Sequence, residues 1–218
     1  MMVLAVGLSL AAAAACAEGW PQAAQTDSFA QGALGEPFTV QALMQGCGPT
    51  ESGDSCTFYA EGVRWIVTRG GQNNAAALDA MAAMPVNAPL IVVGDVMSMG
   101  DITVEAAVSH IEPGAPDAYA DIRAAMQGDW VSQEDTQARL RVVGSEQTDL
   151  YGSEEMAVSV VTFADACPGG EPIGPVLFTQ QMGGDPADLP CYAVVQITPD
   201  RMELSYVGRG NTLVYLRP

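Results

Sequence analysis

The C-terminal half of the chain consists of eight short, strand-like runs separated by clusters of turn residues. The turn clusters are rich in Gly, Pro, Asn and Asp and recur about every 8–12 residues. Within a run, apolar and polar residues alternate: Met202, Leu204 and Tyr206 share one face, and Arg201 and Glu203 share the other. Alternation over many short strands is typical of an antiparallel barrel or sandwich, because each strand has one buried and one solvated face.

A short helix is predicted directly before these strands. Asp117 is placed to cap the run 118–127, and Gly128 follows where a helix would end. Trp130 then opens the first strand, and Arg217 lies in the last one. A helix, a Gly-x-Trp sequence, eight strands and a terminal Arg together resemble the lipocalin (calycin) plan.

The resemblance implies a specific contact at one end of the barrel. In that family the Trp closes the barrel floor, and the Arg of the last strand lies across its indole as a cation–π contact. Gly128, Trp130 and Arg217 would form this floor, with Arg209 as the alternative partner of the indole.

The barrel predicted over residues 117–218 is shorter than a full lipocalin. A small eight-stranded barrel can be filled entirely by its own side chains, or it can hold one small ligand. The candidates for filling it are Met156, Val158, Val160, Phe178, Val194, Met202, Leu204 and Tyr206. A filled barrel would be structural, whereas a hollow one would carry a small apolar ligand.

The N-terminal half has a different order of elements. The strand-rich segments 37–45 and 57–69 precede a helix that Asn73 is placed to cap and that Pro85 ends, and two more strands follow. This order resembles a small OB-like barrel over residues 36–113, and a small α+β sandwich is the rival architecture. OB-folds often bind oligonucleotides or sugars.

The predicted fold class is therefore mainly β: an OB-like barrel with one helix, then a short helix and an eight-stranded lipocalin-like antiparallel barrel. The Pro- and Gly-rich run 113–116 is the predicted domain boundary. Residues 18–35 are rich in Ala, Gln and Gly without an apolar period, and they predict a flexible tether.

Residues 1–17 have the character of an export signal. Their uncharged stretch is too short for a spanning helix, which needs about 20 apolar residues. The run Ala13–Cys16 resembles a bacterial lipobox, which would place a lipid on Cys16; alternatively, cleavage occurs before Glu18. We expect a periplasmic or outer-membrane-anchored protein of a Gram-negative-type bacterium, attached to a membrane only through that lipid.

The cysteine count agrees with export. Without Cys16, four cysteines remain, one near pair in each half of the chain. An even count in an exported chain predicts disulfides, here Cys47–Cys56 and Cys167–Cys191. The chain has no CxxC sequence and one histidine, so we expect neither a metal site nor a cofactor.

The net charge of −18 restricts the partners, because the chain contains no lysine and only eight arginines. Nucleic acid and anionic membrane surfaces are disfavoured, since both need Lys and Arg to displace counterions from phosphates. An envelope protein or a small apolar ligand is the expected partner.

No catalytic constellation is convincing in the sequence. His110 would need an orienting acid such as Glu112 or Asp101 to serve as a general base. Ser98 and Ser109 lack the strand–turn–helix context of an activated nucleophile.

The expected function is therefore a non-catalytic binding or assembly protein of the cell envelope, with Arg209 as a candidate contact for a partner. The alternatives are a carrier of a small apolar ligand in the second barrel and an inhibitor of an envelope-active hydrolase.

Overall fold

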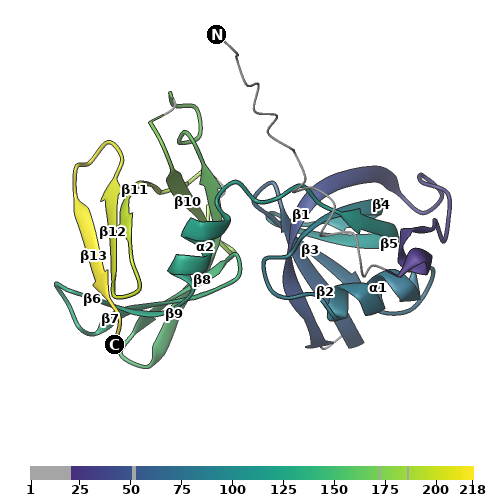
Figure 1. Ribbon diagram of the computed structural model, residues 1–218, viewed down its shortest axis with the longest axis horizontal. Coiled ribbons are helices and arrows are strands. Elements are labelled where there is room, and N and C mark those ends of the chain that lie inside the picture. Colours follow the sequence, from purple (N-terminus) through teal and green to yellow (C-terminus); the bar gives the residue numbers. More distant parts are fainter. Residues whose placement is uncertain (1–20, 51–52, 172, 186) are drawn as a thin grey trace, which may run out of the picture.

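The computed structural model describes residues 21–50, 53–171, 173–185 and 187–218, and it contains two closed β-barrels joined by a short linker (Figure 1). The predicted fold class is confirmed at this level: a five-stranded barrel with a helix, then a short helix and an eight-stranded antiparallel barrel. Cys16 and the predicted export signal lie outside the described residues. Within the described part, no helix has the length and apolar character needed to cross a membrane.

The first barrel closes five strands in the order β1-β2-β3-β5-β4. The strands are β1 (Glu36–Thr50), β2 (Gly53–Ala60), β3 (Val63–Thr68), β4 (Pro89–Met99) and β5 (Thr103–Pro113). The β3–β5 pair is parallel and the others are antiparallel. The long strand β1 closes the ring because it pairs with β2 through its C-terminal half and with β4 through its N-terminal half.

Two local predictions change in this barrel. The strand-rich run 57–69 is a hairpin, because Glu61 and Gly62 both have positive φ (55° and 77°) and reverse the chain between β2 and β3. The Gly- and Pro-rich stretch after Gln45 continues as strand, since Cys47 pairs directly opposite Cys56.

Helix α1 (Ala75–Ala82) begins one residue later than predicted. Asn74 is its cap and accepts hydrogen bonds from the amides of Ala76 and Ala77. Asn73 instead connects the start of the helix to strands β3 and β5. It donates to the Thr68 carbonyl and accepts from the Val108 amide.

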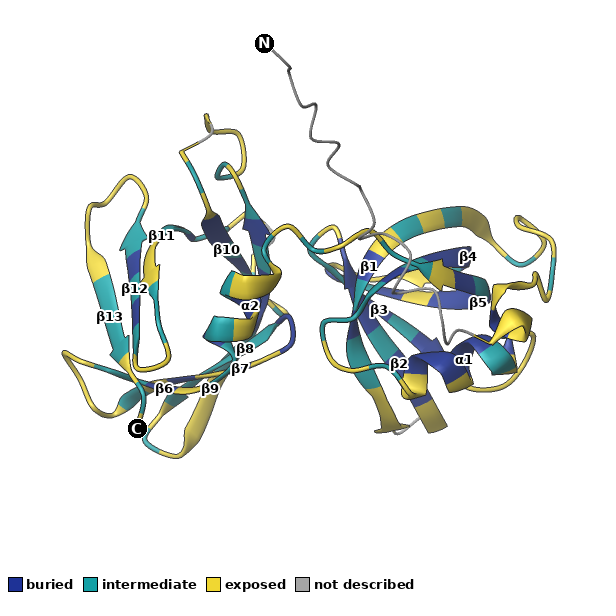
Figure 2. Ribbon diagram, in the orientation of Figure 1, coloured by how far each residue is buried: buried dark blue, intermediate teal, exposed yellow. Residues whose placement is uncertain are grey.

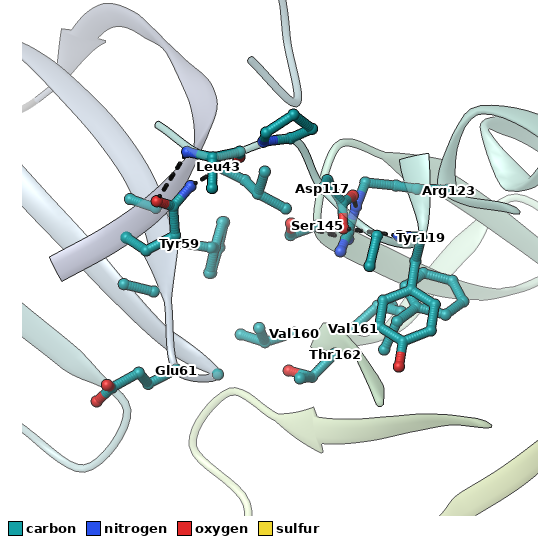
Figure 3. A pocket seen from close by; sticks show the side chains of 18 residues that line it. Leu43, Tyr59, Glu61, Asp117, Tyr119, Arg123, Ser145, Val160, Val161 and Thr162 are labelled. Carbon is teal, nitrogen blue, oxygen red and sulfur yellow. Dashed lines mark hydrogen bonds and ion pairs between the residues drawn. The ribbon is translucent and has the colours of Figure 1, made fainter. Parts of the chain in front are cut away.

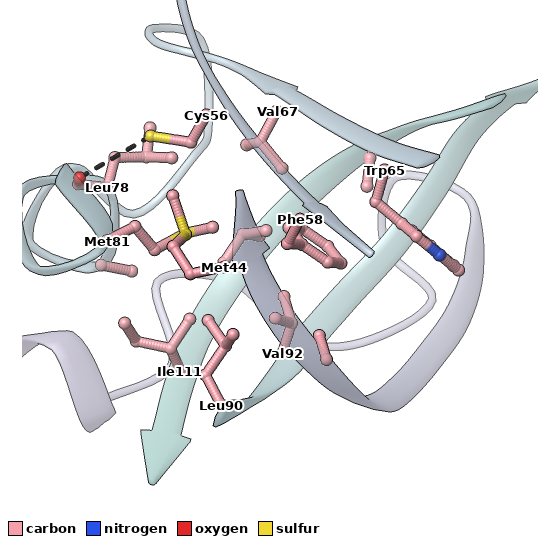
Figure 4. Packing of buried hydrophobic residues seen from close by; sticks show 14 of the residues in the cluster. Met44, Cys56, Phe58, Trp65, Val67, Leu78, Met81, Leu90, Val92 and Ile111 are labelled. Atoms are coloured by element: carbon pink, nitrogen blue, oxygen red, sulfur yellow. Dashed lines mark hydrogen bonds between the residues drawn. The ribbon is translucent and has the colours of Figure 1, made fainter. Parts of the chain in front are cut away.

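Helix α1 lies over one end of the first barrel and completes its core (Figure 4). Leu78 and Met81 of the helix are fully buried with Met44, Phe58 and other inward side chains of the strands. The buried residues form one continuous cluster, so the interior of the first barrel is solid.

Residues 21–35, the described part of the predicted tether, lie against this barrel. The 3₁₀ helix η1 (Gln22–Gln25) buries Ala24 completely in the core cluster. Asp95 of β4 accepts hydrogen bonds from the amides of Gly32, Leu34 and Gly35. Composition predicted a tether because Ala and Gln show no apolar period, whereas one small side chain and backbone amides make these contacts.

The second barrel is an up-and-down ring of eight strands, and all eight predicted strands are present. The elements are α2 (Ala120–Met126), β6 (Gly128–Ser132), β7 (Ala138–Val143), β8 (Glu146–Tyr151), β9 (Glu154–Ala164), β10 (Val176–Gln181), β11 (Cys191–Ile197), β12 (Arg201–Tyr206) and β13 (Thr212–Leu216). Sequential strands pair in order, and β13 pairs with β6 to close the ring.

The two ends of this ring differ. The turns β7–β8, β9–β10 and β11–β12 lie at the end that α2 covers, which we call the closed end. The turns β6–β7, β8–β9, β10–β11 and β12–β13 lie at the opposite, open end. Buried positions alternate with exposed ones along strands such as β7 (Figure 2).

Candidate functional site

The closed end of the second barrel is sealed by Trp130. Its side chain is 0% exposed, and its indole Nε1 donates to the Met126 carbonyl at 2.8 Å. The guanidinium carbon of Arg217 lies 3.7 Å from the ring centroid, so the terminal strand covers the indole from outside.

Gly128 makes that cover sterically feasible. It has a φ of +99°, and a Cβ there would lie 2.7 Å from Nη1 of Arg217. Arg217 also donates to three backbone carbonyls, those of Ala125, Asp129 and Pro199. The Gly-x-Trp sequence thus supplies both the indole and the space for the arginine above it.

Arg209, the alternative partner of Trp130, lies elsewhere. It belongs to the β12–β13 turn at the open end, and its guanidinium carbon stands 4.9 Å from the ring centroid of Tyr206. Tyr206 in turn packs edge-on against Tyr192, with the ring centroids 5.0 Å apart.

The interior of the second barrel is filled only toward the closed end. The filling residues are Met126, Trp130, Leu140, Val142, Val161, Phe163, Leu177, Met202 and Leu204. Four predicted fillers are wrong. Met156 is 61% exposed, and Val160 packs outward against Tyr59 and Ile102 of the first barrel. Val158 shares the outward face of β9 with Val160, and Phe178 faces outward between Leu177 and Thr179, which line the interior. Both faces of β9 are apolar because its outer face meets the other domain, so alternation alone could not identify the inner one.

A cavity of about 200 Å³ occupies the rest of the interior, toward the open end. Its lining is mostly polar, with carboxylate, amide and hydroxyl groups above a floor of leucines. The lining residues are Leu140, Gln147, Asp149, Ser159, Leu177, Thr179, Gln181, Gly184, Asp185, Asp188, Pro190, Tyr192, Leu204, Leu213 and Tyr215.

Asp149 is the most buried carboxylate of this cavity. It has one hydrogen bond, from Nε2 of Gln147 at 3.0 Å, and no ion pair among the described residues. Burial raises the pKa of Asp149 above its usual value, and the hydrogen bond from Gln147 offsets this only in part.

Two tyrosines face the same space from strands β11 and β13. Burial, followed by the charge of Asp149, raises the pKa of Tyr215 to about 12. Burial also raises the pKa of Tyr192, and the nearby Tyr206 and Asp149 add to this. Asp149, Tyr192 and Tyr215 all line this cavity.

Two mostly buried residues present hydroxyl groups to the cavity, and neither hydroxyl has a hydrogen-bond partner among the described residues. Ser159 is 5% exposed and Thr179 is 8% exposed, and both line the cavity. These two therefore leave donors and acceptors available to whatever enters the barrel.

A second cavity, of about 300 Å³, lies between the two barrels (Figure 3). Its walls come from β1 and β2 of the first barrel, the linker, α2 and strand β9. Gln41 holds the linker by donating to the Ala115 carbonyl and accepting from the Ala115 amide.

The polar side chains around this second cavity are used in structural contacts. The Arg123 side chain is only 7% exposed; it pairs with Asp117 at 2.8 Å and lies over the Phe163 ring at 5.0 Å. Tyr119 donates to Asp165 at 2.7 Å.

Tyr59 joins the two barrels directly. It donates to Glu146, and burial together with this bond raises its pKa well above the usual range. Gln45 bridges to the Val143 carbonyl and the Ser145 amide. These contacts hold the two barrels together, in contrast with the unpartnered groups of the barrel cavity.

His110, the sole histidine of the chain, is bound on both ring nitrogens. Nδ1 contacts Asp27, and Nε2 lies 3.3 Å from Glu112. Ser109 is buried and donates to the Val93 carbonyl, while Ser98 donates to Glu105. The contact with Asp27 anchors the N-terminal segment to β5. Nδ1 also lies 3.5 Å from the hydroxyl oxygen of Ser109, which donates to the Val93 carbonyl.

Both disulfides have the expected pairing. Cys47–Cys56 joins β1 to β2 across nine residues, and Cys167–Cys191 joins the β9–β10 loop to β11 across 24 residues. Within the described part of the chain, no group of three or more His, Cys, Asp or Glu residues could hold a metal ion.

Sequence reasoning missed the cavity residues, although a signal was present. In the run Glu146–Tyr151, Gln147 and Asp149 occupy the inward positions of an alternating strand, where apolar residues are expected. A carboxylate and an amide on the inner face of a barrel strand indicate a polar interior. Comparison of the chain with known protein families, curated proteins and solved structures found no match.

Proposed function

We propose that this protein is an exported, non-catalytic binding protein of the cell envelope that holds a small polar ligand inside its second barrel. The observation that carries the proposal is the cavity of about 200 Å³, to which Ser159 and Thr179 present hydroxyl groups without hydrogen-bond partners. Ligand sites are concave, largely preformed and marked by a few converging polar groups.

Export rests on the signal-like residues 1–17 and receives support from the two disulfides. Disulfides persist in oxidising compartments and are rare in the cytosol. In this view the second barrel is a short lipocalin-like barrel, with Trp130 and Arg217 as its floor, and the first is an OB-like barrel that supports it.

The two alternatives from the sequence have less support. An apolar ligand would need the apolar part of the interior, which Trp130, Met202 and their neighbours already fill. Inhibition of a cationic envelope hydrolase is supported only by the net charge of −18, which would attract such a partner.

The test is a thermal-shift screen of the purified full chain against small polar metabolites. A ligand at about 100 times its Kd stabilises the folded protein by about 2.7 kcal/mol. The matched control is Ser159→Leu, which should fill the cavity and leave the outer surface unchanged. The proposal is wrong if every compound in the screen shifts the two proteins equally.

A further inference from the structure

The charges around the barrel cavity all have one sign. Its formally charged lining residues are Asp149, Asp185 and Asp188, and no arginine or histidine is among them. Asp149 lies inside the barrel, whereas Asp185 and Asp188 are exposed in the β10–β11 loop at the open end. An occupant would therefore meet carboxylates both at the opening and in the interior.

Three other carboxylates of this half of the chain pair with arginines, whereas Asp149 does not. Asp117 pairs with Arg123, Asp129 pairs with Arg141 at 2.8 Å, and Glu203 pairs with Arg201 at 3.1 Å. Asp149 is more enclosed than Asp129 yet has only an amide partner. A half-buried carboxylate without a cation loses part of its hydration, and a positively charged partner offsets that loss.

The rest of the lining suits an organic cation better than a metal ion. The described carboxylates do not come together as a group that could hold a metal. The aromatic rings of Tyr192 and Tyr215 line the cavity, and such rings attract ammonium and guanidinium groups across their faces. Arg209 already makes this kind of contact with Tyr206 at the open end.

We propose, on the basis of the proposed function, that the occupant of the barrel cavity is a small organic cation: an ammonium or guanidinium compound that also carries hydrogen-bonding groups. Its positive charge lies at Asp149 against Tyr192 and Tyr215, and its polar groups bond to Ser159 and Thr179. A cavity of about 200 Å³ limits the occupant to a small molecule, such as a diamine or an amino sugar.

The experiment is isothermal titration calorimetry of the full chain with three cations and their neutral counterparts. The pairs are 1,4-diaminobutane with 1,4-butanediol, choline with 3,3-dimethyl-1-butanol, and glucosamine with glucose. At least one cation should bind at least tenfold more tightly than its neutral counterpart. A hydrogen bond to a charged group contributes about 1.5–3 kcal/mol, so Asp149→Asn should weaken cation binding about 10- to 100-fold.

Two further variants locate the site. Asp200→Asn removes an exposed carboxylate at the β11–β12 turn of the closed end and should leave cation binding unchanged. Arg209→Ala removes a positive charge near the open end and should strengthen cation binding about two- to fivefold.

The pH dependence of cation binding is an independent test of the role of Asp149. Cation binding should weaken as the pH falls and Asp149 becomes protonated. Asp185 and Asp188, which also line the cavity, and Tyr192, Tyr215 and Arg209 are the other charged or titratable groups near Asp149. Asp149→Asn should remove most of this pH dependence.

The outcomes separate this inference from the proposed function. If the neutral compounds bind as tightly as the cations, or if Asp149→Asn leaves the preference intact, the cationic ligand is excluded and a polar ligand stands. If none of the six compounds binds, the cationic ligand is likewise excluded. The metabolite screen with Ser159→Leu then tests the proposed function by itself.

Discussion

Asp95 of the first barrel and Asp149 of the second barrel both lie at inward or covered positions, but their pKa values shift in opposite directions. Asp95 of the first barrel is covered by residues 32–35 and receives three backbone amides. Burial alone would raise the pKa of Asp95, but these hydrogen bonds outweigh it, and the pKa is lowered. Asp149 of the second barrel has one amide partner, and its pKa is raised by burial.

The comparison separates a barrel with a filled interior from a barrel with a cavity in one half. Fully buried side-chain atoms without a hydrogen-bond partner occur in or beside the first barrel, at Arg64, Trp65 and Asn87. The first barrel is solid, with α1 closing one end and the N-terminal segment covering Asp95. The second barrel closes its floor with Trp130 and leaves polar groups in its open half without partners. Because these polar groups line a cavity, they are available to an occupant of the second barrel.

The largest expected effect is the loss of the second barrel's floor. Trp130→Ala removes a fully buried indole and its contact with Arg217 and should destabilise the second barrel by about 3–5 kcal/mol. Hydrogen exchange should then accelerate in β6–β13 and stay slow in β1–β5. Trp65→Ala, in the first barrel's core, is the matched variant and should give the reverse pattern.

The next effect concerns the disulfides. From the entropy of the unfolded chain, Cys167–Cys191 should stabilise the fold by about 3.5 kcal/mol and Cys47–Cys56 by about 2.7 kcal/mol. The difference arises because Cys47–Cys56 closes the shorter loop. Denaturant unfolding of the two Cys→Ser double variants measures both values. Equal losses, or a greater loss for Cys47–Cys56, would contradict the loop-length explanation.

A smaller effect is that replacing each aspartate by asparagine should change the stability of its barrel in opposite directions. Asp95→Asn should destabilise the first barrel by about 1–3 kcal/mol, because it weakens charge-assisted hydrogen bonds to three amides. Asp149→Asn should leave the stability of the empty second barrel unchanged or increase it, since a buried neutral amide costs less than an unpaired carboxylate. Thermal unfolding without ligand measures both, and a loss of stability in Asp149→Asn would mean that the carboxylate has a structural role.

The smallest effect is the pH dependence that follows from these pKa shifts. Asp95, with a lowered folded pKa, contributes stability above its unfolded pKa of about 3.9, and this is lost as the pH falls through the lower folded value. Asp149, with a raised folded pKa, costs stability when ionised, and the cost disappears as the pH falls toward about 3.9.

Wild-type protein and Asp149→Asn should therefore converge in stability on acidification, whereas wild-type protein and Asp95→Asn should converge only at still lower pH. Unfolding curves measured between neutral and acidic pH test this order. Convergence of both variants at the same pH would show that the two carboxylates experience similar surroundings.

The sequence alone determined the architecture because that information is local. Period-two alternation, turn clusters, a helix-ending Gly128 and paired cysteines each act over a few residues, and they sufficed for two β domains and both disulfides. The contact between Trp130 and Arg217 was expected from the resemblance to the lipocalin plan, with Arg209 as the alternative. The structure forms it because the closed ring puts the first and last strands side by side.

Only the tertiary structure decided which face of β9 is inside, since Val160 is buried by the neighbouring barrel and not by its own. It also decided that residues 21–35 dock, because the groups that hold them are backbone amides and one alanine. The cavity depends on how far inward side chains from eight strands reach across the ring. How far these side chains reach across the ring is set by the closed barrel, and it cannot be read from the sequence of any one strand.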